Sequence, residues 1–252
     1  MLKKIVLICM TCCVILLVWQ GIYFFYGKEL FTLPSPLHVV EKLIRHYDRF
    51  AWHAYNTFLE MIGGMFFAAL IAFPLAWAMY VYPSIRTTSQ FLFLLTQCLP
   101  MFALAPIMVT CFGWSYMAIL IPTTLMLIFP LTTNVYRGVS QVPQEYIDFF
   151  RMHGAREWQI LLKLRIPYAL PHIFSGLRIA SAVSGVGAIA GEFAGAQVGL
   201  GVYIQECRRN FDIEGIFAGL FCLAALTLSF YGVMAAIEKL CSRGAHDEAK
   251  IC

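Results

Sequence analysis

Charged side chains are scarce in this chain of 252 residues. Asp, Glu, Lys and Arg make up 13% of the sequence, whereas 60% of the residues are hydrophobic, and the mean hydropathy is +0.74. A water-soluble globule of this length needs more polar surface than such a sequence provides. The composition therefore excludes a soluble protein and predicts one integral membrane domain of the all-α class.

The sequence also lacks the signatures of several kinds of chemistry. It contains no GxxxxGK[ST] phosphate loop and no HExxH zinc motif, and its six histidines show no metal-ligand spacing. Most of the nine cysteines lie in apolar runs, where cysteine behaves as a small hydrophobic residue. The net charge of +4 comes without basic clusters that would suit a nucleic acid. We therefore expect a non-catalytic chain with no metal, no cofactor and no nucleic acid partner.

Six apolar segments have the length of about 20 residues that a membrane-spanning helix needs. They are residues 5–26, 58–82, 91–112, 115–136, 173–196 and 216–237. The first is interpreted as a retained anchor, because its apolar stretch is longer than that of a signal peptide. The predicted parts of the chain are an anchor helix (1–30), an amphipathic segment (31–57), a core with five spanning helices (58–240) and a tail (241–252).

The distribution of basic residues predicts the orientation of these helices. Cytoplasmic loops of membrane proteins carry an excess of Lys and Arg. With the N-terminus inside, 12 of the 18 Lys and Arg residues fall on the cytoplasmic side. Both termini and the longest loop, residues 137–172, are therefore predicted to be cytoplasmic, and residues 31–57 to be outside. In that outer segment, Ser35 and Pro36 are typical of a helix start and predict an amphipathic helix on the outer membrane surface. The alternative is a packed element without a separate function.

Glycines recur every fourth residue in the fifth apolar segment, at Gly187, Gly191 and Gly195. This spacing forms a smooth strip on one helical face and allows a second helix to approach closely. The strip predicts tight helix packing and is a candidate seam between two copies of the chain.

Glu192 is an ionisable residue within the same segment. Such side chains are costly in a membrane and usually face a cavity, a partner or an interface. Our hypothesis is that Glu192 lines the outer end of a pathway. The alternative is a carboxylate near the helix end whose hydrogen bonds stabilise the turn into Gly199 and Gly201.

The long loop at 137–172 carries unusually many polar and charged residues. Periodicity predicts a short amphipathic helix over 144–153, ended by Gly154, and a second helix containing Trp158. Pro167 is expected to stop this second helix, and Pro171 to lie in the first turn of the next spanning helix. Two short helices with exposed aromatic and charged residues suit either the docking of another protein or a position on lipid headgroups.

The same loop resembles the EAA motif of the permease subunits of ATP-binding cassette (ABC) importers, E-A-A-x-x-x-G followed after nine residues by I-x-L-P. The glycine and the proline match, the acid is shortened to Asp, and phenylalanines replace the two alanines. The motif falls on Asp148, Phe149, Phe150, Gly154, Leu164, Ile166 and Pro167. Within the loop, the resemblance also assigns Arg151, His153 and Ala155 to coupling with an ATPase.

Three further stretches are similar to the importer branch for sulfonates, nitrate and thiamine-pyrimidine or riboflavin precursors. They are LPSP at 33–36, PYALPHIFSGLRIA at 167–180 and GEFAGAQVGLGVYI at 191–204. The resemblance implies a type I importer permease with six spanning helices in the bacterial inner (plasma) membrane. Its implied partners are an ABC ATP-binding subunit, a periplasmic or extracellular substrate-binding protein, a second permease copy and membrane lipid. The alternative is an ion-coupled secondary transporter, or another polytopic protein without an ATPase partner.

Overall fold

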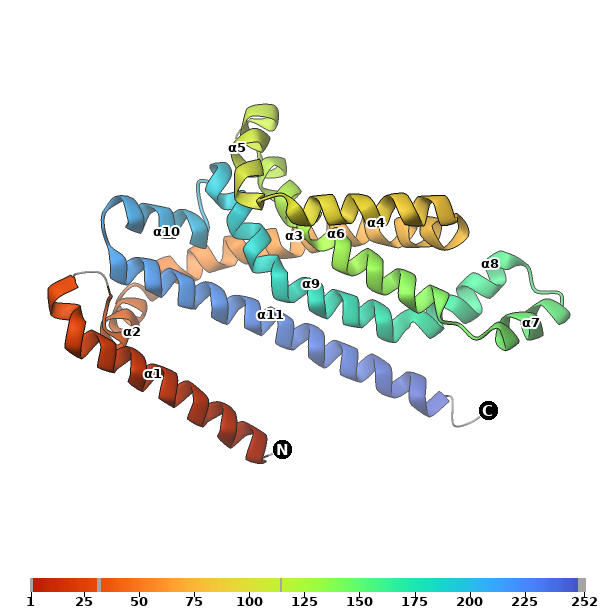
Figure 1. Ribbon diagram of the computed structural model, residues 1–252, viewed down its shortest axis with the longest axis horizontal. Coiled ribbons are helices and arrows are strands. Elements are labelled where there is room, and N and C mark those ends of the chain that lie inside the picture. The colour runs from red at the N-terminus through yellow and green to blue at the C-terminus, as the bar shows by residue number, and fades with distance from the viewer. Residues whose placement is uncertain (1, 31–32, 114, 249–252) are drawn as a thin grey trace.

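A computed structural model describes residues 2–30, 33–113 and 115–248 of the chain. In these ranges every regular element is a helix, which confirms the all-α class. Figure 1 shows an elongated molecule with α2 and α10 at one end and α7 and α8 at the other. The long helices run between these two ends.

Four helices form the body of the molecule: α3 (Tyr47–Val81), α6 (Tyr116–Ser140), α9 (Ile166–Gly195) and α11 (Ile213–Glu248). The shortest of them has 25 residues, which corresponds to a length of about 37 Å and exceeds the hydrocarbon core of about 30 Å. Among the described residues, the stretches that are long and apolar enough to cross a membrane are Tyr47–Val81, Tyr116–Ser140, Glu157–Gly195 and Ile213–Cys241. These stretches correspond to four of the six predicted spans, to within one residue where a predicted span extends beyond them.

Small side chains allow the helices of the body to approach closely. A Cβ added at Gly64 of α3 or at Gly187 of α9 would collide with Thr123 of α6, and one added at Gly191 would meet the backbone of Ile119. The buried core beside these contacts includes Met61, Leu127, Leu131 and Ala180. Close backbone approach, with apolar side chains filling the remaining space, is typical of helix packing in membranes.

The predicted helix over 91–112 is not continuous. The structure has α4 (Pro83–Cys98) followed by α5 (Met101–Phe112), with a bend of 85° between them. Leu99 is extended, with φ −76° and ψ 127°, because the following residue, Pro100, disfavours helical geometry at its predecessor. The apolar segment over 91–112 is therefore divided between two helices, which form either one broken span or a re-entrant loop.

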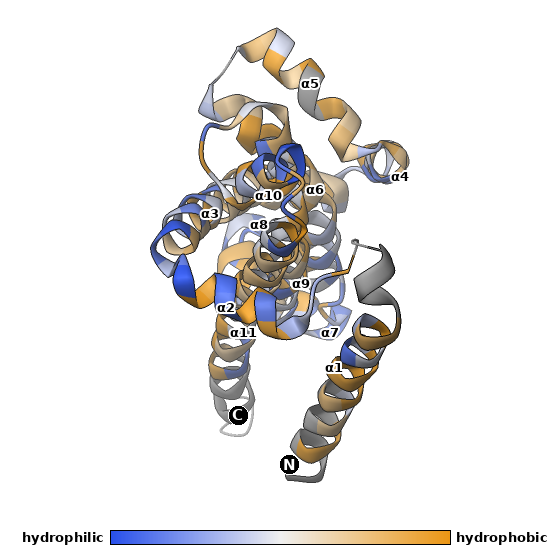
Figure 2. Cartoon of the chain, turned by 90° about the vertical axis from the view of Figure 1, so that its left-hand side faces the viewer, coloured by the Kyte–Doolittle hydropathy of each residue, from blue (hydrophilic) through white to orange (hydrophobic). Residues whose placement is uncertain are grey.

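The N-terminal region consists of α1 (Leu2–Leu30) and α2 (Pro36–Arg45). Ser35 caps α2 as predicted, since its Oγ accepts a hydrogen bond from the Leu37 N–H at 3.3 Å. Trp19 of α1 stacks on Phe221 of α11, with ring centroids 5.5 Å apart. Away from this contact, α1 diverges from the body, and Figure 2 shows apolar residues along it and alternating polar and apolar residues along α2.

Four shorter elements complete the described chain. They are α7 (Gln144–Met152), α8 (Glu157–Ile160), the π-helix η1 (Leu161–Arg165) and α10 (Leu200–Arg209). The prediction that Pro167 stops the second loop helix was wrong, because α8, η1 and α9 continue into one another and Ile166 is helical, with φ −64° and ψ −51°. Pro171 likewise lies inside α9. The wide π turn ends at Arg165, two residues before Pro167, and makes room where proline lacks the N–H of a regular α-helix.

Candidate functional site

The helices α7 and α8 share a small hydrophobic core of their own. Ile147 of α7 and Ile160 of α8 are buried together with Val142, and Phe150, Ala155 and Leu164 pack against them. This core fixes the two helices relative to each other and to the start of α9. The motif residues Phe150, Ala155 and Leu164 therefore support the site from within.

Gly154 makes the turn between the two helices. Its φ of +76° lies in the left-handed region, which glycine adopts without strain. The Gly154 N–H donates to the Arg151 carbonyl at 2.9 Å, and the Ala155 N–H donates to the Phe150 carbonyl at 3.0 Å. These two bonds form a Schellman motif, which satisfies carbonyl groups left free at a helix end. The prediction that Gly154 ends the first helix is confirmed.

The other face of α7 and α8 is exposed and carries large apolar side chains. Met152 is 79% exposed, Phe149 54% and Trp158 56%. Near them, a pocket of about 290 Å³ is lined by Phe149, Phe150, His153, Gly154, Ala155, Gln159 and Lys163. Large exposed apolar side chains at the end of a protein are typical of an interaction site.

Polar groups on α7 and α8 bond mostly to each other. Arg151 pairs with Glu157 at 2.8 Å, and this partner raises the pKa of Arg151. Asp148 accepts a hydrogen bond from Gln144 at 2.9 Å, and His153 Nδ1 lies 2.8 Å from the Phe149 carbonyl oxygen. Of the remaining motif residues, Ile166 and Pro167 are exposed at the start of α9. Gln159 of α8 and Lys163 of η1 also line the pocket, and the sequence motif did not indicate them.

Glu192 lies towards the opposite end of the molecule and is only 2% exposed. Thr57 Oγ1 donates to Glu192 Oε1 at 2.5 Å, and the Gly201 N–H donates to Oε2. The Leu200 N–H in turn donates to Thr57 Oγ1 at 2.9 Å. These hydrogen bonds fasten the turn between α9 and α10 to α3, as the alternative reading of Glu192 expects.

The surroundings of Glu192 contain a second carboxyl group and a pocket. Glu60 of α3 is also 2% exposed, and its Oε2 has no hydrogen-bond partner among the described residues. Glu192 borders a pocket of about 390 Å³ that also touches Gly195, Gln205 and Arg209. The contacts of Thr57 and Glu60 with Glu192 were not predicted, because more than 130 residues separate the two segments in the chain.

The glycine strip lies within the chain. Gly187 and Gly191 face α6, and Gly195 ends α9 beside the pocket. Gly187 and Gly191 are therefore covered by a helix of the same chain, and these two residues provide no seam for a second copy.

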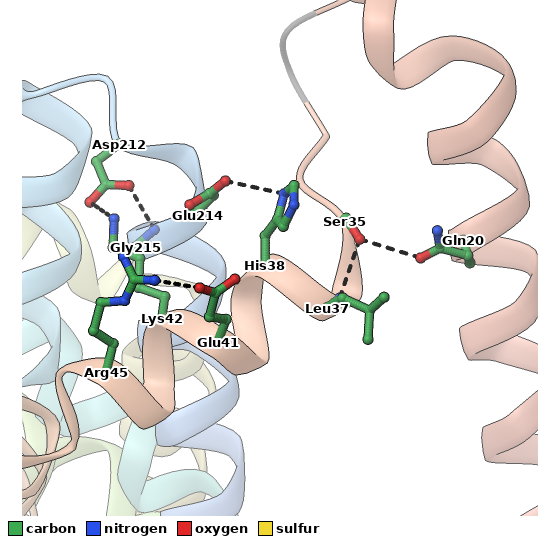
Figure 3. Close-up of polar contacts among 10 residues, drawn as sticks. All are labelled: Gln20, Ser35, Leu37, His38, Glu41, Lys42, Arg45, Asp212, Glu214 and Gly215. Atoms are coloured by element: carbon green, nitrogen blue, oxygen red, sulfur yellow. Dashed lines mark hydrogen bonds and ion pairs between the residues drawn. The ribbon is translucent and has the colours of Figure 1, made fainter.

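At the same end, α2 is held to the loop before α11 by a polar cluster (Figure 3). Lys42 Nζ donates to Asp212 Oδ2 at 2.5 Å, and the Gly215 N–H donates to Asp212 Oδ1 at 3.0 Å. His38 lies 3.5 Å from Glu214. A pocket of about 280 Å³ opens beside these residues and Arg45.

Comparison with known proteins decides the family. Residues 64–243, more than half of the chain, match the family described as binding-protein-dependent transport system inner membrane component. The chain belongs to this family. It is thus an ABC importer permease, a multi-pass membrane protein of a family whose members are generally not catalytic.

Curated relatives of this permease cover most of its length. A probable ABC transporter permease protein of Haemophilus influenzae is 30% identical over 86% of this chain and 89% of its own. The formylaminopyrimidine transport permease protein ThiX of Halalkalibacterium halodurans is 31% identical over 90% of this chain and 89% of its own. The riboflavin transport system permease protein RibX of Chloroflexus aurantiacus is 31% identical over 92% of this chain and 88% of its own.

The fold of the permease is also similar to a solved structure. A chain of the MetNI methionine ABC transporter in an inward facing conformation aligns with a TM-score of 0.65 and 19% sequence identity. The alignment covers 75% of this chain and 94% of the other. At this identity the likeness concerns the fold.

Proposed function

We propose that this permease forms, together with a second copy, the membrane pathway of an ATP-driven importer for a small solute. An ATP-binding subunit docks on α7 and α8, and a substrate-binding protein delivers the solute at the opposite end. The chain crosses the bacterial inner membrane six times, with α1 and the bent pair α4–α5 completing the four long spans. Hydrolysis of ATP takes place in the partner subunit.

The observation that carries this proposal is the exposed apolar face of α7 and α8. Phe149, Met152 and Trp158 project from helices that lie at the far end of the long body (Figure 1). Burying a large apolar side chain is worth about 1.5–3 kcal/mol. A groove of the ATPase that buries these side chains would therefore contribute several kcal/mol to its binding.

The orientation is supported by the arrangement of the ends. The N-terminal end of α1 and the C-terminal end of α11 both point the same way as α7 and α8 (Figure 1). With this end in the cytoplasm, the excess of Lys and Arg also falls inside. The opposite end, with α2 and α10, is then available to the substrate-binding protein.

The coupling mechanism follows from the continuity of α8, η1 and α9. They form an uninterrupted stretch of 39 residues from Glu157 to Gly195. Movement imposed on α7 and α8 by closure of the ATPase would be transmitted along this stretch to the turn that Glu192 holds. In this mechanism Glu192 lies at the outer end of the pathway, next to the pocket of about 390 Å³.

For the solute, we propose a small heterocyclic vitamin precursor such as a thiamine pyrimidine. The relatives named for formylaminopyrimidine and riboflavin transport support this choice. A second candidate is a sulfonate-type anion, since a relative from Escherichia coli is named the taurine transport system permease protein TauC. Identification of the ligand bound to the substrate-binding protein encoded next to this chain would decide between them.

The decisive experiment uses Gly154. A residue other than glycine in the left-handed region costs roughly 1–2 kcal/mol, asparagine the least and β-branched residues the most. Apart from the two chain neighbours of Gly154, no atom of the described residues would lie within 4 Å of a Cβ at this position, so Gly154→Val disturbs the turn without a clash against the rest of the fold. We expect the ATPase to co-purify with the wild type and with Gly154→Asn, and to be lost from Gly154→Val at equal membrane abundance.

The alternative of an ion-coupled transporter makes the opposite prediction. Uptake would then continue without any ATPase and would stop when an uncoupler collapses the ion gradient. Retention of the ATPase by Gly154→Val at the wild-type level would also contradict the proposed docking site.

A further inference from the structure

Arg165 is a buried cation at the junction between the loop helices and α9. It is only 3% exposed and forms no ion pair with a carboxylate among the described residues. A buried charge without an opposite charge is unfavourable for folding, and a leucine would fill the same place at lower cost. Stability alone does not explain an arginine at this position.

The contacts of Arg165 join three helices. Its Nη1 donates to the Val139 carbonyl at 2.9 Å, in the last turn of α6, where carbonyl groups lack partners within the helix. Its guanidinium carbon lies 4.3 Å from the centre of the Tyr80 ring, near the end of α3. Arg165 itself directly precedes α9. The guanidinium group of Arg165 thus joins the C-terminal ends of α3 and α6 to the N-terminal end of α9.

The π turn of η1 is what directs Arg165 inward. The Ile166 N–H donates to the Leu161 carbonyl five residues earlier. In a regular α-helix, residues five apart point about 140° away from each other, whereas a π turn brings them closer to the same face. Ile160 and Arg165 are both buried, so the wide turn lets Ile160 enter the α7–α8 core and Arg165 enter the body.

We propose that Arg165 is a positioning residue that clamps the inner ends of α3, α6 and α9, so that force arriving at α7 and α8 moves them as one body. The inference rests on the proposed function, because it assumes that an ATPase acts on α7 and α8. A desolvated cation–π contact shifts the equilibrium between clamped and separated helix ends by a factor of roughly 30. Without the contacts of Arg165, α7 and α8 would move and the end of α3 would not follow them.

The test measures whether the helix ends move together. Spin labels replace Tyr82, after α3, and Tyr168, in α9, which are both exposed, in a chain freed of its own cysteines and reconstituted in lipid with its ATPase. For the distance within one chain, we expect a narrow distribution that ATP does not change. In Arg165→Gln the distribution should broaden or shift when ATP is added, and Arg165→Lys, which keeps the charge and a donor, should restore part of the wild-type behaviour.

Tyr80→Leu serves as a second variant, since it removes the ring and leaves Arg165 in place. Arg178→Gln is the matched control, because Arg178 lies in α9, which continues from Arg165, but pairs with Glu238 of α11 at 2.9 Å. The control should leave the distance between the labels unchanged with and without ATP.

Several outcomes would overturn the inference. The first is that the distance distribution stays narrow with ATP in both Arg165→Gln and Tyr80→Leu. The second is that these variants broaden the distribution equally with and without ATP. A wild-type distance that changes with ATP would also contradict it. Failure of the ATPase to co-purify with the wild type would instead refute the proposed function, so the two failures are distinguishable.

Discussion

Lys42 and Asp212 join two segments that are 170 residues apart in the chain. Burial raises the pKa of Asp212, but the hydrogen bonds from Lys42 and the Gly215 N–H and the charge of Lys42 outweigh it. The pKa of Asp212 therefore lies below its ordinary value of 3.8. At the scale of single residues, this pair is the clearest polar tie between α2 and the loop before α11.

We predict that Asp212→Asn lowers the free energy of unfolding at pH 7 by about 1 kcal/mol. Because the folded-state pKa is lowered, this stabilisation is fully present above the ordinary value of 3.8 and is lost as the pH falls through the folded-state pKa. Thermal unfolding of both proteins in the same lipid discs should therefore differ at pH 7, and the difference should shrink as the pH falls through the folded-state pKa of Asp212. Glu41→Gln, which removes an exposed pair within α2, should have a smaller effect.

Helix-capping preferences predicted the residues whose contacts lie within a few positions in the chain. Ser35 as a helix cap and Gly154 as a helix end follow from the chemistry of a few consecutive residues. The partners of Arg165, Glu60 and Thr57 could not be predicted in this way, because they are distant in the chain. Arg165 in particular occupies an unspecified position of the motif, and only the π turn brings it into the body.

At the scale of elements, the turn between α9 and α10 depends on a carboxylate that accepts hydrogen bonds with both oxygens. An amide in place of Glu192 offers one acceptor and one donor, so one buried N–H group or hydroxyl group would lose its partner at a cost of about 1–3 kcal/mol. We predict that Glu192→Gln and Thr57→Val both lower the unfolding temperature.

Transport separates the two roles of Glu192. A residue of the pathway should lose more uptake in Glu192→Gln than in Thr57→Val, measured at equal membrane abundance. Equal losses in the two variants would indicate that Glu192 only holds the turn.

The sequence predicted the ends of helices that have a capping residue, such as Ser35 or Gly154. It did not predict correctly which prolines end a helix. Pro100 breaks the predicted helix over 91–112, whereas Pro167 lies within a continuous helix. Both prolines disfavour the same local geometry, and the difference is the π turn before Pro167. The π turn depends on the packing of Ile160 and Arg165 against different parts of the fold. This packing could not be inferred from the sequence.

At the scale of the whole molecule, the two ends of the bundle should face different compartments. In a cysteine-free background, a cysteine replacing Met152 on α7 should react with an impermeant maleimide only after the cytoplasmic side is opened. A cysteine replacing Phe211, which is 89% exposed before α11, should react in intact spheroplasts. The reverse pattern would overturn the orientation and, with it, the docking of an ATPase on α7.

The membrane character and four of the long helices were readable from hydropathy alone, since length and apolarity are properties of continuous segments. The arrangement of these helices was not, because it depends on which glycine meets which backbone. Gly187 and Gly191 were predicted to pack tightly, and only the fold shows that α6 is their partner.

The exposed apolar face of α7 and α8 has a consequence for the cell. A copy of this chain made in excess of its ATPase presents Phe149, Met152 and Trp158 to chaperones and proteases, which recognise such surfaces on unassembled subunits. The amount of transporter would then be set by whichever gene is translated less, and surplus permease would be degraded.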